Sequence, residues 1–270
     1  MMLRQREVPR SRDPVTQVIL GAEPFEFGEG DHAVLFLHGW TSSPRELRFL
    51  AEKAAREGFR CRGPLLRGHG TTLRDLEKVS FADHLEECER EFARLAMAHK
   101  RVTVCGLSMG GLLALHLAAR RKVANLVLLA PFLRPWGKTL GIPNDWLLGR
   151  VPLAGNLPKR GSGPINDPGG ASGHIAYHAM PSLGLLGLIR GYREFAGLAS
   201  RVVCPTLILH STGDRTSDFT GSLELMRSLG SEDRTLTAYT RSNHVLTLDY
   251  DRPRVESTAV EWLTKRKLEG

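Results

Sequence analysis

Three side chains that together can activate a hydroxyl group lie far apart in the chain, at Ser108, Asp214 and His244. Ser108 stands in the pentapeptide GLSMG (106–110), between a short apolar run and a longer stretch rich in leucine. A serine hydroxyl is a weak nucleophile until a neighbouring base accepts its proton, and a histidine oriented by a carboxylate is such a base. These residue types predict acyl transfer, with Ser108 as nucleophile, His244 as base and Asp214 as the orienting acid.

The glycines on both sides of Ser108 indicate how its hydroxyl would be presented. A strand that turns directly into a helix at G-x-S-x-G forces the central residue into a sparsely allowed backbone conformation, which only small neighbours tolerate. The hydroxyl then lies at a helix N-terminus, where outward-facing N–H groups favour a developing negative charge. We therefore expect residues 106–110 to form a nucleophile elbow.

A second loop could supply the groups that stabilise this negative charge. In FLHGWTSSP (36–44) an apolar run ends in a sharp turn, which predicts that the backbone N–H of Trp40 faces the nucleophile. Together with the N–H of Met109 it would form an oxyanion hole, in which one donor is worth roughly 3–4 kcal/mol in the transition state.

Several of these residues also have plainer interpretations. Ser108 could be an ordinary helix N-cap, His244 a polar loop residue, and Asp214 a turn residue after a glycine. Asp218 competes with Asp214 as the acid, and we favour Asp214 because it lies nearer the end of the preceding apolar run.

Four other histidines are expected to play no chemical role. His38 and His69 should shape loops near the site through hydrogen bonds. His174 and His178 have the i, i+4 spacing of zinc ligands, but the sequence places no third ligand nearby, so we expect no metal site.

Short apolar runs alternate with stretches of helical period along most of the chain, which predicts alternating strands and helices. The predicted strands cover 33–39, 59–64, 102–106, 124–131, 202–214 and 234–240. The predicted helices cover 43–58, 81–98, 109–121, 181–199, 219–230 and 252–267, the last with Asp251 as its N-cap. The alternation favours a mostly parallel sheet with helices on both faces, whose carboxyl edge would collect Ser108, Asp214 and His244.

The alternation breaks at 133–200, which predicts an inserted cap or lid between two parts of the core, 1–132 and 201–270. Residues 1–14 are expected to be a flexible lead-in. The cap carries seven Lys/Arg against three Asp/Glu together with many apolar residues, so we expect transient contact with a micelle or membrane surface. The side chains predicted to line a substrate pocket are Trp146, Leu147, Leu185, Ile189 and Val245.

The composition narrows the class of protein. With 270 residues, 41% of them hydrophobic and 24% charged, the chain fits one large α/β domain. The formal charge of +8 is scattered, so no nucleic-acid partner is expected. The chain has no apolar stretch of about 18 residues and no signal-peptide core, so a soluble, cytoplasmic protein is expected. The four cysteines lack a C-x-x-C pair, and free buried thiols are favoured over disulfides.

Five segments in order give the chain a family resemblance: LFLHGWTSSPRELRFLAE, LLRGHGTTLRDLEKVSFADH, CGLSMGGLLAL, VVCPTLIL and SNHVLTLDYDRP. The chain resembles the α/β-hydrolase superfamily and, within it, bacterial monoacylglycerol lipases and small carboxylesterases. The resemblance implies the α/β-hydrolase fold. It places the family's nucleophile, acid and base on Ser108, Asp214 and His244, and its oxyanion amides on Trp40 and Met109.

The resemblance also implies an activity, the hydrolysis of carboxylic esters with medium or long acyl chains, such as monoacylglycerols or simple esters, through an acyl-enzyme. No cofactor or metal is expected, and the expected partner is a small ester or lipid substrate. A thioesterase or a carbon–carbon bond hydrolase with the same triad, and a non-catalytic binding protein, remain as alternatives. A serine at position 108 argues against dehalogenase and epoxide hydrolase chemistry, which proceed through an aspartate.

Overall fold

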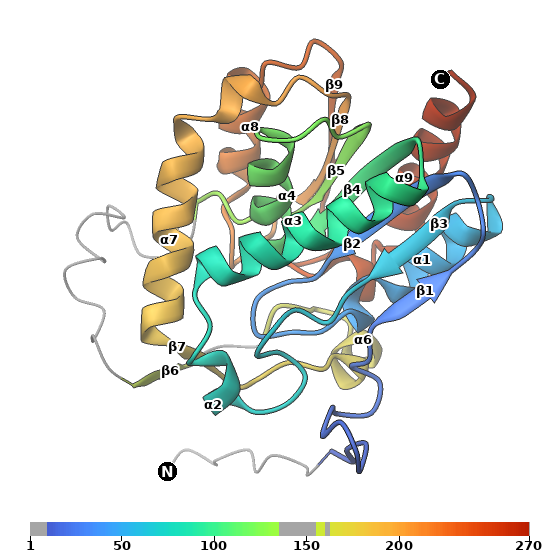
Figure 1. The fold of residues 1–270 in the computed structure, drawn as a ribbon. Coiled ribbons are helices and arrows are strands. Elements are labelled where there is room, and N and C mark those ends of the chain that lie inside the picture. The colour runs from blue at the N-terminus through green and yellow to red at the C-terminus, as the bar shows by residue number, and fades with distance from the viewer. Residues whose placement is uncertain (1–9, 135–154, 160–162, 270) are drawn as a thin grey trace.

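A single large sheet organises the molecule. The computed structural model describes residues 10–134, 155–159 and 163–269, and within these residues seven strands form one sheet in the order β1-β3-β2-β4-β5-β8-β9 (Figure 1). The strands are β1 (Phe25–Phe27), β2 (His32–Leu37), β3 (Arg60–Gly63), β4 (Arg101–Leu107), β5 (Asn125–Leu129), β8 (Thr206–Ser211) and β9 (Arg234–Tyr239). β1 is antiparallel to β3, whereas all other neighbouring strands are parallel. The predicted mostly parallel α/β sheet is confirmed.

Helices cover both faces of this sheet (Figure 1). α1 and α9 pack against one face, α3, α4 and α8 against the other, and α7 packs on α3 and α4. The helices are α1 (Arg45–Arg56), α2 (Leu73–Leu76), α3 (Phe81–Ala98), α4 (Met109–Ala118), α6 (Pro168–Gly173), α7 (Ser182–Ala196), α8 (Phe219–Ser228) and α9 (Arg252–Leu268). Among the described helices, none combines the length and apolar content that crossing a bilayer requires.

The strand sequences explain why both faces are covered. In β2, Ala33, Leu35 and Leu37 belong to the apolar cluster under α3 and α4, while Val34 and Phe36 belong to the cluster under α1 and α9. Every residue of β2 is buried, as expected for a strand covered on both faces. Because the strands themselves are apolar and buried, the polar residues lie in the loops that follow them, at the carboxyl edge of the sheet.

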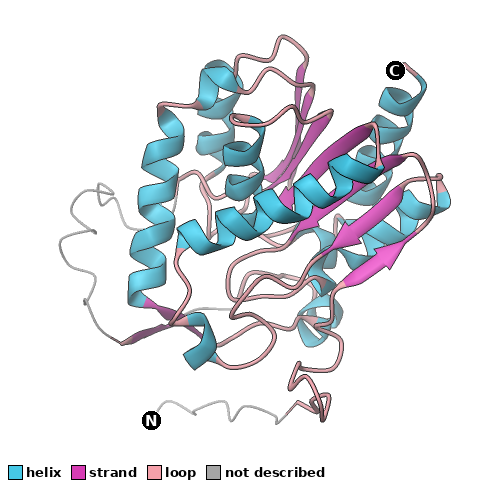
Figure 2. Ribbon diagram, in the orientation of Figure 1, coloured by secondary structure: helices cyan, strands magenta, loops and turns pink. Residues whose placement is uncertain are grey.

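Between β5 and β8 the chain leaves the sheet. There β6 (Asn156–Pro158) pairs antiparallel with β7 (Ala179–Pro181), and β7 leads directly into α7. Figure 2 shows the β6–β7 pair apart from the large sheet, next to the first turn of α7. The division of the chain into a core and a cap at 133–200 stays a prediction.

Several elements differ from the sequence-based prediction, among them α2, α6, β6 and β7, which were not predicted. β1 was not predicted, because three residues at a sheet edge are too few to show a period. The strand predicted at 202–214 is shorter, since β8 begins at Thr206. Pro205, just before it, has no N–H to donate to a neighbouring strand.

Residues 10–14 make specific contacts, while the flexibility expected of residues 1–14 stays a prediction because residues 1–9 lie outside the described residues. Asp13 Oδ1 accepts hydrogen bonds from the backbone N–H groups of Val15 and Thr16 at 3.0 and 2.6 Å. Arg10 Nη2 donates to the carbonyl oxygen of His174 at 2.6 Å. The start of the described chain is thereby joined to the segment that lies between β5 and β8.

The four cysteines are free thiols, as predicted. Cys61, Cys88 and Cys105 are buried and Cys204 is half-buried. Burial raises the pKa of Cys61 to about 12 and that of Cys204 to about 11. These sulfurs are therefore protonated at neutral pH and poorly reactive.

Candidate active site

Ser108 occupies a strained turn between β4 and α4. Its backbone has φ 55° and ψ −117°, a region that residues other than glycine rarely adopt. A Cβ at Gly106 would lie 2.2 Å from the carbonyl oxygen of Gly110, and a Cβ at Gly110 would lie 1.9 Å from that of Leu37. Both positions therefore require glycine. The Ser108 side chain makes no helix-capping hydrogen bond, so the N-cap interpretation does not apply.

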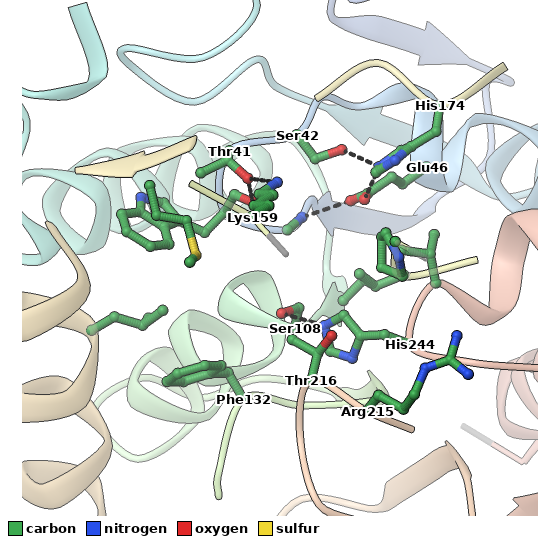
Figure 3. Close-up of a pocket in the computed structure, with 18 of the residues that line it drawn as sticks. Thr41, Ser42, Glu46, Ser108, Phe132, Lys159, His174, Arg215, Thr216 and His244 are labelled. Carbon is green, nitrogen blue, oxygen red and sulfur yellow. Dashed lines mark hydrogen bonds and ion pairs between the residues drawn. The ribbon is translucent and has the colours of Figure 1, made fainter. Parts of the chain in front are cut away.

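His244 brings Ser108 and Asp214 together. Its Nε2 lies 2.8 Å from Ser108 Oγ, and its Nδ1 lies 2.7 Å from Asp214 Oδ2. Ser108 and His244 keep 8% and 4% of their surface exposed, enough to line a cavity that also contains Trp40. Figure 3 shows Ser108 and His244 joined by a hydrogen bond at the centre of this cavity.

The Asp214 carboxylate is fully buried and well supplied with donors. Oδ1 accepts the backbone N–H groups of Thr216 and Ser217 at 2.7 and 2.9 Å, and Oδ2 accepts from His210 Nε2 at 3.0 Å as well as from His244. Burial by itself raises the pKa of Asp214, but the adjacent His244 and the hydrogen bonds from His210 and His244 outweigh it and hold this pKa well below its usual range. The acid is therefore ionised at neutral pH. The sequence analysis did not identify His210, which lies in β8 four residues before Asp214.

The loop that carries His244 is fixed by two aspartates. Asp251 Oδ2 accepts the N–H groups of Arg241 and Ser242 at 3.0 and 2.9 Å, and Asp249 Oδ2 accepts that of Asn243 at 2.8 Å. Asp251 stands at the N-cap position of α9 as predicted, but its side chain makes no capping bond there. The predicted N-cap position is confirmed, and its carboxylate accepts from the two loop amides in place of a helix N–H.

Three consecutive N–H groups after β2 face different partners. Gly39 N donates to Glu46 Oε2 at 2.9 Å, and Thr41 N donates to His69 Nε2 at 3.0 Å. Between them, the Trp40 N–H meets no acceptor within the described part of the chain. The Met109 N–H follows Ser108 directly, in the first turn of α4, where helix donors have no intrahelical partner. These two N–H groups are free for a ligand oxygen.

His38 and His69 hold this loop, so the structural role predicted for them is confirmed. His38 Nε2 accepts the Leu66 N–H at 3.1 Å, and its Nδ1 lies 2.9 Å from the carbonyl oxygen of Gly39. Burial lowers the pKa of His38 to about 4 and that of His69 well below its ordinary value. Both rings are therefore neutral at physiological pH.

The cavity at Ser108 has a volume of about 440 Å³ (Figure 3). Its lining includes the apolar side chains of Trp40, Phe132, Met180, Leu185 and Leu188. It also includes a polar wall of Thr41, Ser42, Glu46, Lys159 and His174, which Figure 3 shows together on one side. A bound ester would therefore meet both apolar and polar side chains.

The polar wall carries an amine that the sequence did not single out. Lys159 Nζ donates a hydrogen bond to Thr41 Oγ1. Desolvation lowers the pKa of Lys159 to about 8. This amine and the Glu46 carboxylate give the wall both a donor and an acceptor of charge-assisted hydrogen bonds.

The predicted pocket residues separate into three groups. Leu185 and Val245 line the cavity. Ile189 is fully buried and does not line the cavity. It lies one helical turn further along α7 than Leu185. Trp146 and Leu147 lie outside the described residues.

The remaining candidates have structural roles. Asp218, the competing acid, caps α8 by accepting the Thr220 N–H at 2.8 Å, whereas Asp214 is the carboxylate that contacts His244. His174 follows α6 and contacts Glu46. Across the described ranges no group of three or more His, Cys, Asp or Glu side chains is arranged to hold a metal ion.

A mostly parallel sheet with a strand–turn–helix serine elbow at its carboxyl edge defines an α/β enzyme fold of the hydrolase type. A family model described as "Alpha/beta hydrolase family" matches residues 34–256. The chain belongs to this family, which confirms the resemblance drawn from the sequence.

Curated relatives and solved structures agree with this assignment. A thermostable monoacylglycerol lipase from Bacillus sp. (strain H-257) is 31% identical over 253 residues, which cover 92% of this chain and 96% of the relative. A carboxylesterase from Bacillus subtilis (strain 168) is 24% identical over 251 residues, 92% of this chain and 98% of the relative. A solved structure from work on LipS and LipT, two metagenome-derived lipolytic enzymes, has a TM-score of 0.83 at 30% identity, covering 92% of this chain and 100% of that one. The predicted class, a carboxylic ester hydrolase, is confirmed by these similarities.

Proposed function

We propose that this α/β hydrolase cleaves carboxylic esters through an acyl-enzyme on Ser108, with His244 as general base and Asp214 as the acid that orients it. One observation carries the proposal: the 2.8 Å contact from Ser108 Oγ to His244 Nε2, continued by the 2.7 Å contact from His244 Nδ1 to Asp214 Oδ2. The first contact lies within the range in which a proton is transferred between heavy atoms, and the second is a hydrogen bond that orients the His244 ring.

The first half of the reaction forms the acyl-enzyme. His244 Nε2 accepts the proton of Ser108 Oγ while Oγ adds to the ester carbonyl carbon, and Asp214 stabilises the resulting imidazolium. The negative charge on the former carbonyl oxygen is received by the N–H groups of Trp40 and Met109. The intermediate collapses by breaking the bond to the alcohol oxygen, which leaves with the proton held on His244.

The second half regenerates the enzyme. Water enters the place of the alcohol, gives a proton to His244 Nε2 and adds to the acyl carbon. The same two N–H groups receive the charge again. Collapse returns the proton to Ser108 Oγ and releases the carboxylic acid.

The apolar and polar lining residues of the cavity support a substrate with an apolar acyl chain and a polar alcohol. Trp40, Phe132 and Leu188 offer an apolar surface for a medium or long chain. Lys159 and Ser42 offer hydrogen-bond partners for hydroxyl groups on the alcohol. A monoacylglycerol has this division, so we propose monoacylglycerols as preferred substrates. The cap role of 133–200 and its contact with a lipid surface stay predictions, since much of that segment lies outside the described residues.

Hydrolysis assays test the proposal. Wild-type protein should release p-nitrophenol from the butyrate, octanoate and palmitate esters, with the octanoate or palmitate favoured, and glycerol from monoacylglycerols. Ser108→Ala should lose activity by at least about 10⁴-fold, while Ser200→Ala, a change at an exposed serine away from the cavity, should be unaffected.

Activity that survives Ser108→Ala would rule out the proposed mechanism. A folded wild-type protein that binds these esters without turnover would favour the non-catalytic binding protein. Faster turnover of acyl thioesters than of matched oxygen esters would favour the thioesterase alternative.

A further inference from the structure

A buried carboxylate–histidine pair lies directly beside the proposed oxyanion hole. Glu46, in the first turn of α1, has a side chain only 3% exposed, and the His174 side chain is 11% exposed. His174 Nε2 lies 2.8 Å from Glu46 Oε1 and 3.0 Å from Ser42 Oγ. An ionised carboxylate only accepts hydrogen bonds, so Nε2 carries the proton in this contact. Both residues line the cavity that contains Ser108 (Figure 3).

Both oxygens of Glu46 have a defined use. Oε1 accepts from His174, and Oε2 accepts the backbone N–H of Gly39 at 2.9 Å. Burial by itself raises the pKa of Glu46, but the hydrogen bonds from His174 and from the Gly39 N–H outweigh it and bring this pKa down to about 2. The carboxylate is therefore a permanent acceptor at neutral pH.

Gly39 determines the direction of the Trp40 N–H. The carbonyl oxygen of Gly39 belongs to the same peptide plane as the Trp40 N–H and lies 2.9 Å from His38 Nδ1. In a trans peptide the carbonyl and the N–H point in opposite directions, so fixing this carbonyl aims the Trp40 N–H away from His38. Glu46 holds the N–H of Gly39 and so fixes the position of the Gly39 Cα. The peptide plane that carries the Trp40 N–H begins at this atom.

His174 links this loop to the segment between β5 and β8. The adjoining Gly173 carbonyl accepts from Arg45 Nε at 2.8 Å, and Ser42 Oγ donates to the Ile175 carbonyl at 3.2 Å. The ring of His174 thus reaches Glu46 from a backbone that is itself held in place. The segment between β5 and β8, which supplies several residues that line the cavity, and the loop that carries the oxyanion donor share one hydrogen-bond network.

We infer that Glu46 and His174 are positioning residues for the oxyanion hole, Glu46 by holding the Gly39 N–H and His174 by holding Glu46. The inference rests on the function proposed above. Neither side chain needs to touch the reacting atoms. Because an oxyanion forms in both halves of the reaction, both acylation and deacylation depend on this pair.

The test compares four variants of the full chain: Glu46→Ala, Glu46→Gln, His174→Ala and the Glu46→Ala/His174→Ala double variant. Glu52→Ala is the matched control, a carboxylate on the same helix that does not line the cavity. The measurements are kcat and KM for p-nitrophenyl octanoate, the separate acylation and deacylation rates from burst kinetics, and inhibition by an alkyl trifluoromethyl ketone. Such a ketone forms an oxyanion on the nucleophile.

The expected losses follow from the geometry. A displacement of about 1 Å in a catalytic group costs on the order of 10²-fold, so Glu46→Ala should lower kcat by about 10²-fold with KM changed less than about threefold. The inhibition constant of the ketone should rise in parallel. Glu46→Gln retains an oxygen for the Gly39 N–H and should lose less than about tenfold. His174→Ala should lose about tenfold, and the double variant no more than Glu46→Ala.

Several results would overturn the inference. One is a kcat within threefold of wild type for Glu46→Ala and His174→Ala. A second is a loss confined to acylation, which would place Glu46 on the leaving alcohol instead. If Glu46→Ala does not fold, Glu46→Gln and His174→Ala decide the question, and a change in KM alone in His174→Ala contradicts positioning. The Ser108→Ala result separates the two proposals, since activity without Ser108 would remove the function itself.

Discussion

Acid should destabilise the protein through His38 at a pH where carboxylates are still ionised. His38 accepts the Leu66 N–H with Nε2, so a proton on this nitrogen would place two donors face to face. Burial lowers the pKa of His38 from 6.5 to about 4. The unfolded chain therefore takes up a proton at a pH where the folded chain does not.

The size of the effect follows from linkage. Stability contributed by neutral His38 is fully present above pH 6.5 and is lost as the pH falls toward about 4. At about 1.4 kcal/mol for each tenfold change in an equilibrium, the whole loss is about 3 kcal/mol, and most of it has occurred by about pH 4.5. His32, whose pKa burial also lowers to about 4, acts in the same direction, so a variant is needed to isolate His38.

Urea unfolding of wild type and His38→Gln at about pH 7.5 and about pH 4.5 isolates this contribution. Glutamine cannot gain a charge, and its side-chain oxygen can still accept the Leu66 N–H. The free energy of unfolding should fall by about 2–3 kcal/mol less in His38→Gln than in wild type, while the control His99→Gln, at a half-exposed position after α3, should follow wild type. Equal acid losses in His38→Gln and wild type would refute the reasoning.

Three further outcomes are expected. Asp214→Asn should lower kcat by about 10⁴-fold with little change in melting temperature, because the amide supports the wrong His244 tautomer; a loss below tenfold would contradict this. Gly110→Ala should destabilise the protein by about 3 kcal/mol or more in urea unfolding, since its Cβ would lie 1.9 Å from the Leu37 oxygen, whereas Gly197→Ala, with no atom nearer than 3.7 Å, should be mild. Cys61, whose pKa burial raises to about 12, should resist iodoacetamide in the native protein at about pH 8 and react after denaturation; rapid native alkylation of its peptide would argue against its burial.

Much of the fold and the centre of the site could be predicted because they depend on local patterns. Buried parallel strands give continuous apolar runs such as those in β2 and β5, and the elbow at Ser108 needs glycines at fixed offsets. Asp214 and His244 follow strands β8 and β9, and parallel strands end at one edge. Chain order and strand direction therefore sufficed to suggest that the three residues meet.

The supporting residues could not be predicted, because their partners are distant in the sequence and belong to no pattern. Glu46 and His174 are 128 residues apart and meet only when the segment between β5 and β8 folds over the loop after β2. Asp251 has the ordinary features of an N-cap, and only the position of the loop at 241–242 shows that its carboxylate is used elsewhere. In the sequence, His210 is one residue of a predicted strand. Only the fold shows that the chain turns back after β8 and places the Asp214 carboxylate against its ring.

The central claim is that the Ser108 hydroxyl becomes covalently acylated. Reaction with an alkyl fluorophosphonate, followed by peptide mass spectrometry, tests it most directly in wild type, Ser108→Ala and Ser200→Ala. We predict a single adduct on Ser108 in wild type and in Ser200→Ala, formed in proportion to the loss of esterase activity, and none in Ser108→Ala. An adduct on another residue, or full esterase activity in protein modified at Ser108, would contradict the account.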